Sequence, residues 1–413
     1  MVIISNGFNK FHLARAAACM AGSRRLRCLI TGAYPIPGAA FTATLLSRIA
    51  PFKARRLLDR AESIPQAQVR SLWFPELIDI MGSAFETVGC RRIGESLKVL
   101  SMKLYGRMAG ALLQVGYRKA EIYHYRSGFG GASVRIARNL GMVTLCDHST
   151  VHPALISYLI NNGGKLPPRG DHGHLNRFWQ WILTDIARAD HILVNSEFVK
   201  DTFIHQGWEA NRIDTIYLGV DDQFLGFLER VEPKRRNGRK ACRLLFAGIF
   251  DTHKGAETVI DALRAVKRGD WRFEIAGKVG SAIKRNYASF FNNSRVKPLG
   301  VMLRSELAGH MRNADVLLLP SLAEGSARVI FEAMACGCFI ITTPNAGSIV
   351  QDGVHGILVP PNDSKALKDA VTWTMEQPEK AKRVGARNAV DVRKNFRQSS
   401  YGDKLAKLYD RLV

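Results

Sequence analysis

The sequence predicts an α/β protein built from two doubly wound domains that face each other across a cleft. The chain has 413 residues, which is too long for one ordinary domain and suits two of roughly 150–200 residues. Strand-like apolar runs alternate with helix-like segments in both halves, as expected for parallel sheets with helical crossovers. A polar, charged and non-periodic stretch at residues 222–240 separates the halves and indicates a linker.

The first half, residues 1–221, opens with a strand, a helix and a strand, which predicts a right-handed βαβ unit. These segments are Val2–Ser5, Phe11–Ala21 and Arg27–Gly32. Residues 41–115 predict several helices and little strand. Regular alternation then returns, and the helix Glu197–Gln206 has Asn195 and Ser196 as capping residues. The further predicted strands are Glu121–Tyr125, Met142–Cys146, His191–Val194 and Ile213–Leu218.

The second half, residues 241–395, restarts the same pattern. Its predicted strands are Leu244–Gly248, Phe273–Gly277, Val296–Gly300, Val316–Leu319 and Phe339–Thr342. Its predicted helices include 255–268, Ser305–Asn313 and Ala327–Ala335. Residues 396–413 add a last helix, in which Leu405, Leu408 and Leu412 recur at helical spacing and require a buried partner.

The charge is strongly basic, with 59 Lys and Arg against 36 Asp and Glu, and the excess is spread through both halves. Such an excess favours phosphorylated substrates, an anionic membrane or nucleic acid, and charge alone does not choose between them. The stretch Phe41–Ile64 is basic and amphipathic, so it fits either membrane docking or an ordinary solvated helix. No apolar run is long enough to span a membrane, and the amino terminus does not resemble a signal peptide.

Seven cysteines without a C-x-x-C pair fit a reducing cytoplasm. Cys336 and Cys338 are poorly spaced for zinc, so no metal site is expected. We therefore expect a cytoplasmic protein that contacts a membrane, if at all, only peripherally.

The most informative segment runs from Leu319 to Gly337. A buried strand ends in a loop with Glu324 and Gly325, and a helix follows for which Ser326 is the predicted N-cap. The free N–H groups of such a helix start suit a diphosphate. Glu332 could accept hydrogen bonds from a ribose diol. The alternative is that the two glutamates lie on the surface beside a well-capped helix.

This segment resembles the E-x7-E signature of retaining glycosyltransferase family four, whose fold, GT-B, has two Rossmann-like domains. Phe331–Gly337 is close to that family's E-A-M-A-C-G, and Thr343–Ser348 is similar to its T-x-x-G-G-x loop. The similarity continues through Gln351–Asp363 and is also present at Val194–Val199 and Tyr217–Asp221. It covers roughly residues 120–413 well and the first 120 poorly.

The resemblance implies roles for individual residues. Glu332 would hold the donor ribose, Glu324 the donor sugar, and the backbone amides of Gly325, Ser326 and Ala327 the sugar and phosphates. The family's G-R-x4-K-G pattern matches Gly248–Gly255, in which Lys254 would hold the leaving diphosphate. Ile249 stands where the family has arginine, and Arg328 is a candidate to supply the missing contact.

In the N-terminal domain the resemblance implies a histidine that faces the donor sugar, and His148 fits that position to within one residue. A core or loop histidine is the alternative. The expected catalytic set is His148, Lys254 and Glu324. The family's usual glycine pair in the first loop is reduced to Gly7. The last helix would pack back on the N-terminal domain.

The resemblance implies a retaining, metal-independent glycosyltransferase that uses a UDP- or GDP-sugar and takes part in polysaccharide or glycolipid synthesis. Its acceptor would be a glycan or lipid-linked molecule. The basic charge and the amphipathic stretch Phe41–Arg60, rather than the resemblance, suggest an anionic membrane surface as a further partner, and no nucleic acid is expected. Two alternatives stay open, namely a sugar-nucleotide epimerase of similar fold and a non-catalytic nucleotide-sugar binder.

Overall fold

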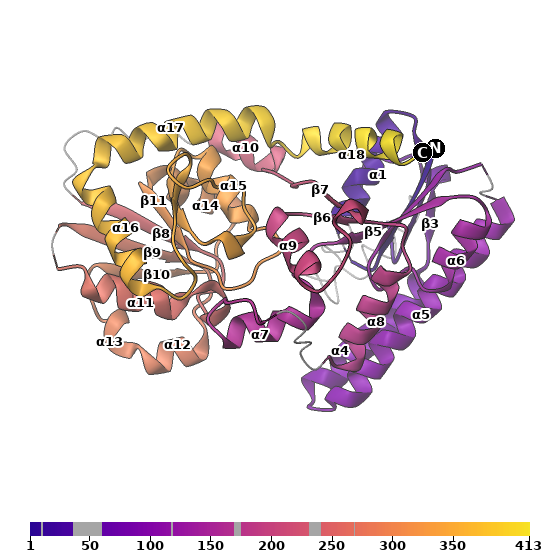
Figure 1. Cartoon of the computed structure of the whole chain (residues 1–413), viewed down its shortest axis with the longest axis horizontal. Coiled ribbons are helices and arrows are strands. Elements are labelled where there is room, and N and C mark those ends of the chain that lie inside the picture. The colour runs from indigo at the N-terminus through magenta and orange to yellow at the C-terminus, as the bar shows by residue number, and fades with distance from the viewer. Residues whose placement is uncertain (10, 36–59, 117–118, 169–174, 231–240, 268) are drawn as a thin grey trace.

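The computed structural model describes every residue except 10, 36–59, 117–118, 169–174, 231–240 and 268. Two α/β domains lie side by side, each with a central parallel sheet covered by helices (Figure 1). The predicted two-domain α/β architecture is confirmed. Most of the stretch Phe41–Ile64 lies outside the described residues.

The N-terminal sheet has seven described strands in the order β3-β2-β1-β4-β5-β6-β7. All of its neighbouring strands run parallel. The order reverses beside β1, which is the switch point where ligands bind in doubly wound sheets. The strands are β1 (Val2–Gly7), β2 (Leu26–Thr31), β3 (Val69–Ser71), β4 (Ile122–Arg126), β5 (Val143–His148), β6 (His191–Val194) and β7 (Ile213–Thr215).

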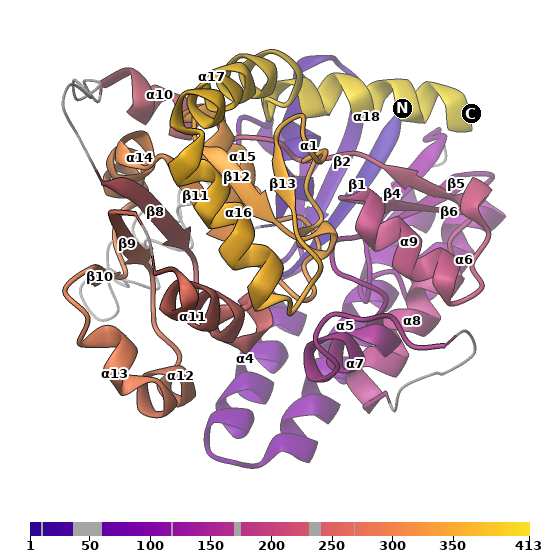
Figure 2. The same cartoon turned by 60° about the vertical axis from the view of Figure 1, so that its left-hand side comes forward.

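The helices of this domain cover both faces of its sheet, and α4 and α5 form a long antiparallel hairpin beside it (Figures 1 and 2). The described α-helices are α1 (His12–Gly22), α4 (Trp73–Thr87), α5 (Arg91–Gly116), α6 (Ala132–Asn139), α7 (Ile156–Asn161), α8 (Arg177–Ala187) and α9 (Glu197–His205). Helix α9 has the predicted cap, because the hydroxyl of Ser196 accepts a hydrogen bond from the N–H of Val199.

The C-terminal sheet has six described strands in the order β10-β9-β8-β11-β12-β13. The strands are β8 (Cys242–Ala247), β9 (Trp271–Ala276), β10 (Val296–Gly300), β11 (Val316–Leu319), β12 (Phe339–Thr342) and β13 (Gly356–Leu358). The α-helices are α10 (Asp222–Arg230), α11 (Ala256–Ala265), α12 (Ser281–Asn286), α13 (Ala288–Phe291), α14 (Arg304–Asn313), α15 (Arg328–Ala335), α16 (Ser364–Glu376), α17 (Pro378–Asn395) and α18 (Ser399–Leu412).

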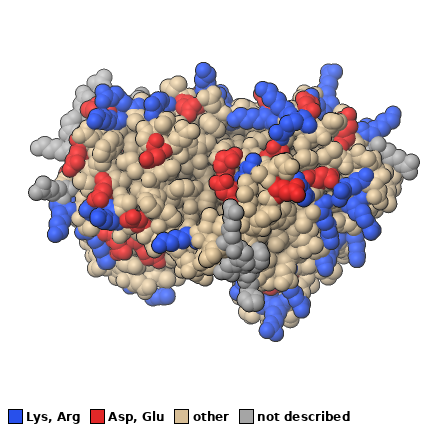
Figure 3. Space-filling model, in the orientation of Figure 1, with Lys and Arg blue, Asp and Glu red and all other residues tan. Residues whose placement is uncertain are grey.

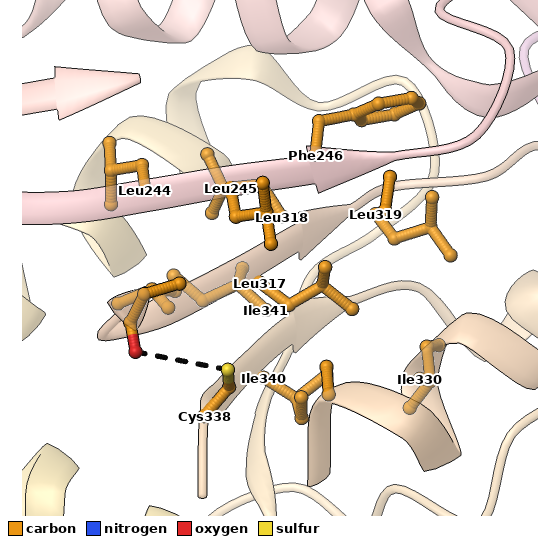
Figure 4. Close-up of a cluster of buried hydrophobic side chains, with 14 of the residues drawn as sticks. Leu244, Leu245, Phe246, Leu317, Leu318, Leu319, Ile330, Cys338, Ile340 and Ile341 are labelled. Carbon is orange, nitrogen blue, oxygen red and sulfur yellow. Dashed lines mark hydrogen bonds between the residues drawn. The ribbon is translucent and has the colours of Figure 1, made fainter. Parts of the chain in front are cut away.

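Strand β11 runs through the centre of the C-terminal core. Its four residues are all fully buried, since helices cover both faces of the sheet there. Figure 4 shows Leu317, Leu318 and Leu319 packed among the side chains of β8 and β12. The thiol of Cys338, drawn in the same view, lies 3.2 Å from the carbonyl oxygen of Met311. This packing fixes the end of β11, from which the Glu324 loop departs.

The chain returns to the N-terminal domain at its end. Helix α17 lies over the C-terminal domain and α18 over the N-terminal domain (Figure 1). Tyr401, Leu405, Leu408 and Tyr409 of α18 are buried in one cluster with residues of α1 and β1. The helix predicted from the leucine spacing therefore finds its buried partner on the N-terminal domain.

The structure corrects the predicted linker. Residues 222–230 form helix α10, and Phe224, Leu225 and Leu228 are buried in the C-terminal core. The sequence that follows α10 is polar and charged, so the short apolar face of this helix was not recognised in the prediction. Of the predicted linker 222–240, the first nine residues are therefore part of the folded C-terminal domain.

Candidate active site

Two loops at the carboxyl end of the C-terminal sheet interlock. One follows β8 and carries Lys254, and the other follows β11 and carries Glu324. The N–H of Leu322 donates to the carbonyl of His253 at 2.9 Å. Gly255 has a φ of 75°, and a Cβ there would lie 2.2 Å from the carbonyl oxygen of Pro320. Only glycine fits this crossing of the two loops.

The interlocked loops bring together two of the predicted catalytic side chains. The Nζ of Lys254 lies 2.5 Å from Oε1 of Glu324, and both side chains are about four-fifths buried. Gly248 lies against the stem of Lys254, since a Cβ at this glycine would meet the Lys254 Cδ at 3.4 Å. Ile249 is half-exposed beside them. A charged pair held this way can exchange partners when an anion and a hydroxyl group enter.

Glu332 lies at a second ion pair. Its carboxylate is largely buried and lies 2.5 Å from Nη2 of Arg304, the first residue of α14. The other nitrogen of Arg304 lies 3.0 Å from Asp221. Burial alone would lower the pKa of Arg304, but Glu332 and Asp221 raise it overall. The sequence analysis missed Arg304, because nothing in its local text distinguishes it from a surface arginine at a helix start.

Asp221, at the junction of the domains, is shared by three arginines. Besides Arg304, it lies 3.3 Å from Nη1 of Arg15 on α1 and 3.5 Å from Nη2 of Arg328 on α15. Burial alone would raise the pKa of Asp221, but hydrogen bonds from Arg304 and the N–H of Gln223, with the nearby arginine charges, lower it overall. Arg328 is thus directed toward the domain junction and lies near Glu332.

The start of helix α15 differs from the prediction. The helix begins at Arg328, Ala327 occupies the N-cap position, and no side chain caps it. The N-cap role of Ser326 is therefore wrong, and its hydroxyl is buried without a partner among the described residues. The N–H of Ala327 is also occupied, because it donates to the carbonyl of Ala346 at 3.0 Å.

Other N–H groups of this segment remain available. Within the described part of the chain, no acceptor faces the N–H groups of Gly325, Ser326, Arg328 and Val329. Uncapped N–H groups at a helix start, together with the positive end of the helix dipole, favour an anion. The predicted anion site thus rests on backbone groups, without a capping serine.

The N-terminal domain closes directly over this loop. The hydroxyl of Ser196 donates to the carbonyl of Gly325. A Cβ at Gly325 would lie 1.8 Å from the carbonyl oxygen of Ser149. The Nδ2 of Asn195 in turn donates to that same carbonyl at 3.0 Å. Gly325 therefore allows the two backbones to approach where the domains meet.

An apolar cluster extends this contact. Val151, Leu155 and Leu159 of the N-terminal domain are buried together with Ala323 of the β11–α15 loop. Nearby, the Nδ2 of Asn345 donates to the carbonyl of Gly164 at 2.7 Å. The sequence analysis assigned no role to residues 151–164, because a contact between domains leaves no short-range pattern.

His148 ends β5 but is enclosed. It is 3% exposed and packs edge-on against Phe203. Its Nδ1 lies 2.9 Å from the hydroxyl of Ser127 and its Nε2 lies 3.1 Å from that of Thr150. Burial lowers its pKa to about 4, so the ring is neutral at pH 7. The structure therefore gives both ring nitrogens protein partners.

Comparison with known protein families adds independent information. Residues 241–377 match the family described as Glycosyl transferases group 1. Residues 91–224 match the family described as Glycosyltransferase Family 4. The two matched regions contain every predicted site residue, on both sides of the domain junction.

Among curated proteins, an uncharacterized glycosyltransferase of Methanocaldococcus jannaschii is 29% identical over 57% of this chain and 62% of its own length. A D-inositol 3-phosphate glycosyltransferase of Paenarthrobacter aurescens is 29% identical over 61% of this chain and 64% of its own length. The chain thus spans a little under two thirds of these relatives.

Solved structures resemble the whole chain in fold. Anabaena HepE in complex with UDP superimposes with a TM-score of 0.62 at 16% identity, and all of both chains is covered. The apo lipopolysaccharide outer core galactosyltransferase WaaB also gives 0.62, at 13% identity, over all of both chains. These neighbours are two-domain proteins of the GT-B fold, as predicted.

Proposed function

We propose that the chain, whose two domains match the families Glycosyl transferases group 1 and Glycosyltransferase Family 4, transfers a sugar from a nucleoside diphosphate sugar to an acceptor bound by its N-terminal domain. The observation that carries this proposal is the grouping of Lys254, Glu324 and the uncapped start of α15 at one sheet edge. Cations and free N–H groups there suit a diphosphate, and the carboxylate suits sugar hydroxyls.

Each donor part has a proposed partner. The diphosphate lies against Lys254 and the N–H groups of Gly325 and Ser326. The family's arginine is absent because Ile249 occupies its position, and Arg328 supplies that contact instead. The two ribose hydroxyls donate hydrogen bonds to the carboxylate of Glu332 and replace Arg304 as its partner. The donor sugar donates to Glu324. A metal ion is not required in this scheme, because Lys254 and the helix start face the charge of the leaving group.

The reaction follows from these positions. The bond between the anomeric carbon and the diphosphate oxygen breaks, and a bond from that carbon to an acceptor oxygen forms. The transition state carries positive charge on the sugar ring and growing negative charge on the diphosphate. We propose that configuration is retained and that the leaving phosphate takes the acceptor proton, as the family resemblance implies. His148 is enclosed by Ser127 and Thr150, and its ring is neutral there.

The acceptor is proposed to be a glycan or a lipid-linked molecule. Relatives of the chain include the amylovoran biosynthesis glycosyltransferase AmsK of Erwinia amylovora. A further relative is the N,N'-diacetylbacillosaminyl-diphospho-undecaprenol α-1,3-N-acetylgalactosaminyltransferase of Campylobacter jejuni. No helix in the described part of the chain is both long and apolar enough to cross a membrane. We propose, independently of that finding, that the reaction takes place in the cytoplasm and belongs to polysaccharide or glycolipid synthesis.

A donor panel tests the proposal. Purified protein is mixed with UDP- and GDP-sugars, and binding is measured by thermal shift and calorimetry, with and without candidate acceptors. We expect one donor class to bind, and its sugar to be transferred when the acceptor is present. Epimerised donor without transfer would favour the epimerase alternative, and binding without any turnover would favour the non-catalytic one. Absence of binding to every donor contradicts the proposed site.

A further inference from the structure

Helix α4 exposes an unusually apolar face. Its residues recur at helical spacing and lie on one side, and each is more than a third exposed although large and apolar. We call this set the α4 face, and it consists of Trp73, Phe74, Leu77, Ile80, Met81, Phe85 and the following Val88. A contiguous apolar surface of this kind is rare on a protein that stays free in water, and marks an interaction site.

The acidic residues of the helix all point away from this face. Glu76 is 3% exposed, pairs with Arg60 at 2.8 Å and accepts a hydrogen bond from the N–H of Ala33. Glu86 pairs with Lys98 at 2.5 Å. Asp79 is partly buried, which raises its pKa. Because α4 carries no other charged residue, its outward face is free of charge.

The opposite side of α4 packs against α5. Gly82 lies so close to the backbone of α5 that a Cβ there would be 2.9 Å from the carbonyl oxygen of Gly94. The hairpin of α4 and α5 projects from the N-terminal domain (Figure 2). Its inner side is therefore satisfied within the chain, while its outer side has no described partner.

Basic residues lie at the end of this surface. Arg91 and Arg92 begin α5 at the tip of the hairpin and are exposed, as is Ile93, and Arg91 also lies 3.2 Å from Glu95 one turn further along the helix. Figure 3 shows Lys and Arg side chains at the lower end of the molecule, where the hairpin lies in Figure 1. The chain as a whole carries a formal charge of +23. An anionic partner is therefore favoured over a neutral or cationic one.

We propose that the α4 face docks the protein on an anionic lipid bilayer, with the α4 side chains among the acyl chains and Arg91 and Arg92 at the headgroups. An uncharged aromatic and aliphatic face beside two exposed arginines, on a chain with a net positive charge, has the composition of an interfacial helix. A protein partner would instead call for hydrogen-bonding groups across the contact. The α4 face presents only apolar side chains.

The α4 face lies close to the edge of the N-terminal sheet where the acceptor is proposed to bind. Helix α4 directly follows β3, and Glu76 ties its first turn to Ala33, just after the carboxyl end of β2. Acceptors bind at the carboxyl edge of such sheets. The docking surface thus begins beside the acceptor side of the cleft. The binding to the bilayer is inferred from the α4 face alone. The role of that binding rests on the proposed function, because docking would bring the cleft close to a lipid-linked acceptor.

Vesicle flotation tests the docking. The full chain is mixed at low salt with two kinds of vesicle. One kind is phosphatidylcholine alone, and the other also contains about 30 mol% of the anionic lipid phosphatidylglycerol. We expect flotation with the anionic vesicles and much less with the neutral ones. The triple variant Leu77→Gln, Ile80→Gln, Met81→Gln should lower the floated fraction at least about tenfold. The double variant Arg91→Glu, Arg92→Glu should lower it on anionic vesicles and weaken its salt dependence.

Matched controls separate docking from other effects. Val115→Gln with Val390→Gln removes exposed apolar residues elsewhere, and Lys382→Glu with Arg383→Glu removes an exposed basic pair on α17. Both controls should float like the unaltered protein, and all variants should give its circular dichroism spectrum. Donor binding, measured by calorimetry without vesicles, reports on the proposed function independently.

Two outcomes overturn the inference. The first is an unaltered protein that stays at the bottom of the gradient with anionic vesicles at low salt while it still binds donor. The second is a dimer in analytical ultracentrifugation that the triple variant converts to monomer without any change in flotation, because a second copy of the chain would then cover the α4 face.

Discussion

The substitution Gly325→Ala adds a single methyl group, and we expect it to push the two domains apart where they meet at this residue. A Cβ added there would lie 1.8 Å from the carbonyl oxygen of Ser149 and 3.2 Å from Nδ2 of Asn195. Real Cβ atoms essentially never approach other atoms within 3.0 Å. The two backbones must therefore separate by about 1.2 Å, a shift of the kind that overpacking causes.

The cost of Gly325→Ala falls on the closed arrangement. Separation also stretches the hydrogen bond from Ser196 to the Gly325 carbonyl and loosens Ala323 from its apolar cluster. Overpacking of this kind costs ~1–3 kcal/mol, which corresponds to a closed state that is roughly 5- to 150-fold less populated. The donor groups all lie in the C-terminal domain, so donor binding should change less than transfer.

The assay measures kcat for transfer and the donor Kd by calorimetry. We expect kcat to fall by roughly 5- to 150-fold, with a much smaller change in Kd. Gly309→Ala is the control, because Gly309 lies within α14 and a Cβ there meets nothing within 4 Å. A Gly325→Ala variant with unchanged kcat, or one with unchanged domain separation in X-ray scattering, would refute the reasoning.

Three further predictions concern the donor site and stability. Glu332→Ala should weaken donor binding by ~1–3 kcal/mol, the cost of losing charge-assisted hydrogen bonds, and Glu379→Ala, an exposed carboxylate on α17, should leave the calorimetric Kd unchanged. Lys254→Ala should lower kcat by about 10²–10³-fold, as loss of one preorganised donor does, and a kcat within a factor of about three would remove Lys254 from the mechanism. Burial lowers the pKa of His148 to about 4, so the unfolded chain binds its proton at higher pH than the native protein does. The free energy of unfolding should therefore fall as the pH drops from about 6.5 to about 4, and His148→Gln should flatten that part of the urea-measured profile.

The central strands of both sheets could be predicted because they are buried on both faces. Such strands are continuous apolar runs with clear ends, and the predicted bounds of His191–Val194, Val316–Leu319 and Phe339–Thr342 agree with the structure. Strand β3, Val69–Ser71, was missed since it has three residues, none of them fully buried. Its place at the sheet edge gives it no apolar signature.

The site was only partly predictable, for a different reason. Glu324, Glu332 and Lys254 lie in motifs whose spacing survives in the sequence. Arg304 becomes visible only when α14 is packed beside α15, which places it against Glu332. Ser326 illustrates the converse, since serine is a favoured capping residue. Here the backbone of the loop is instead held by Asn345 and Ala346, and the helix starts at Arg328, one residue later than predicted.

The two ion pairs of the site suggest how the sugar is recognised. Lys254 pairs with Glu324 in the β11–α15 loop, and Arg304 pairs with Glu332 in α15, so each of these largely buried carboxylates has a cation beside it. A nucleoside diphosphate that attracts Lys254 away would leave Glu324 without its partner, which is costly for a mostly buried charge. A donor that carries its sugar supplies hydroxyl groups to Glu324 at the same moment. On the proposed function, the pair between Lys254 and Glu324 therefore favours the complete donor over the free nucleotide, and the release of the nucleotide after transfer is assisted because the pair forms again.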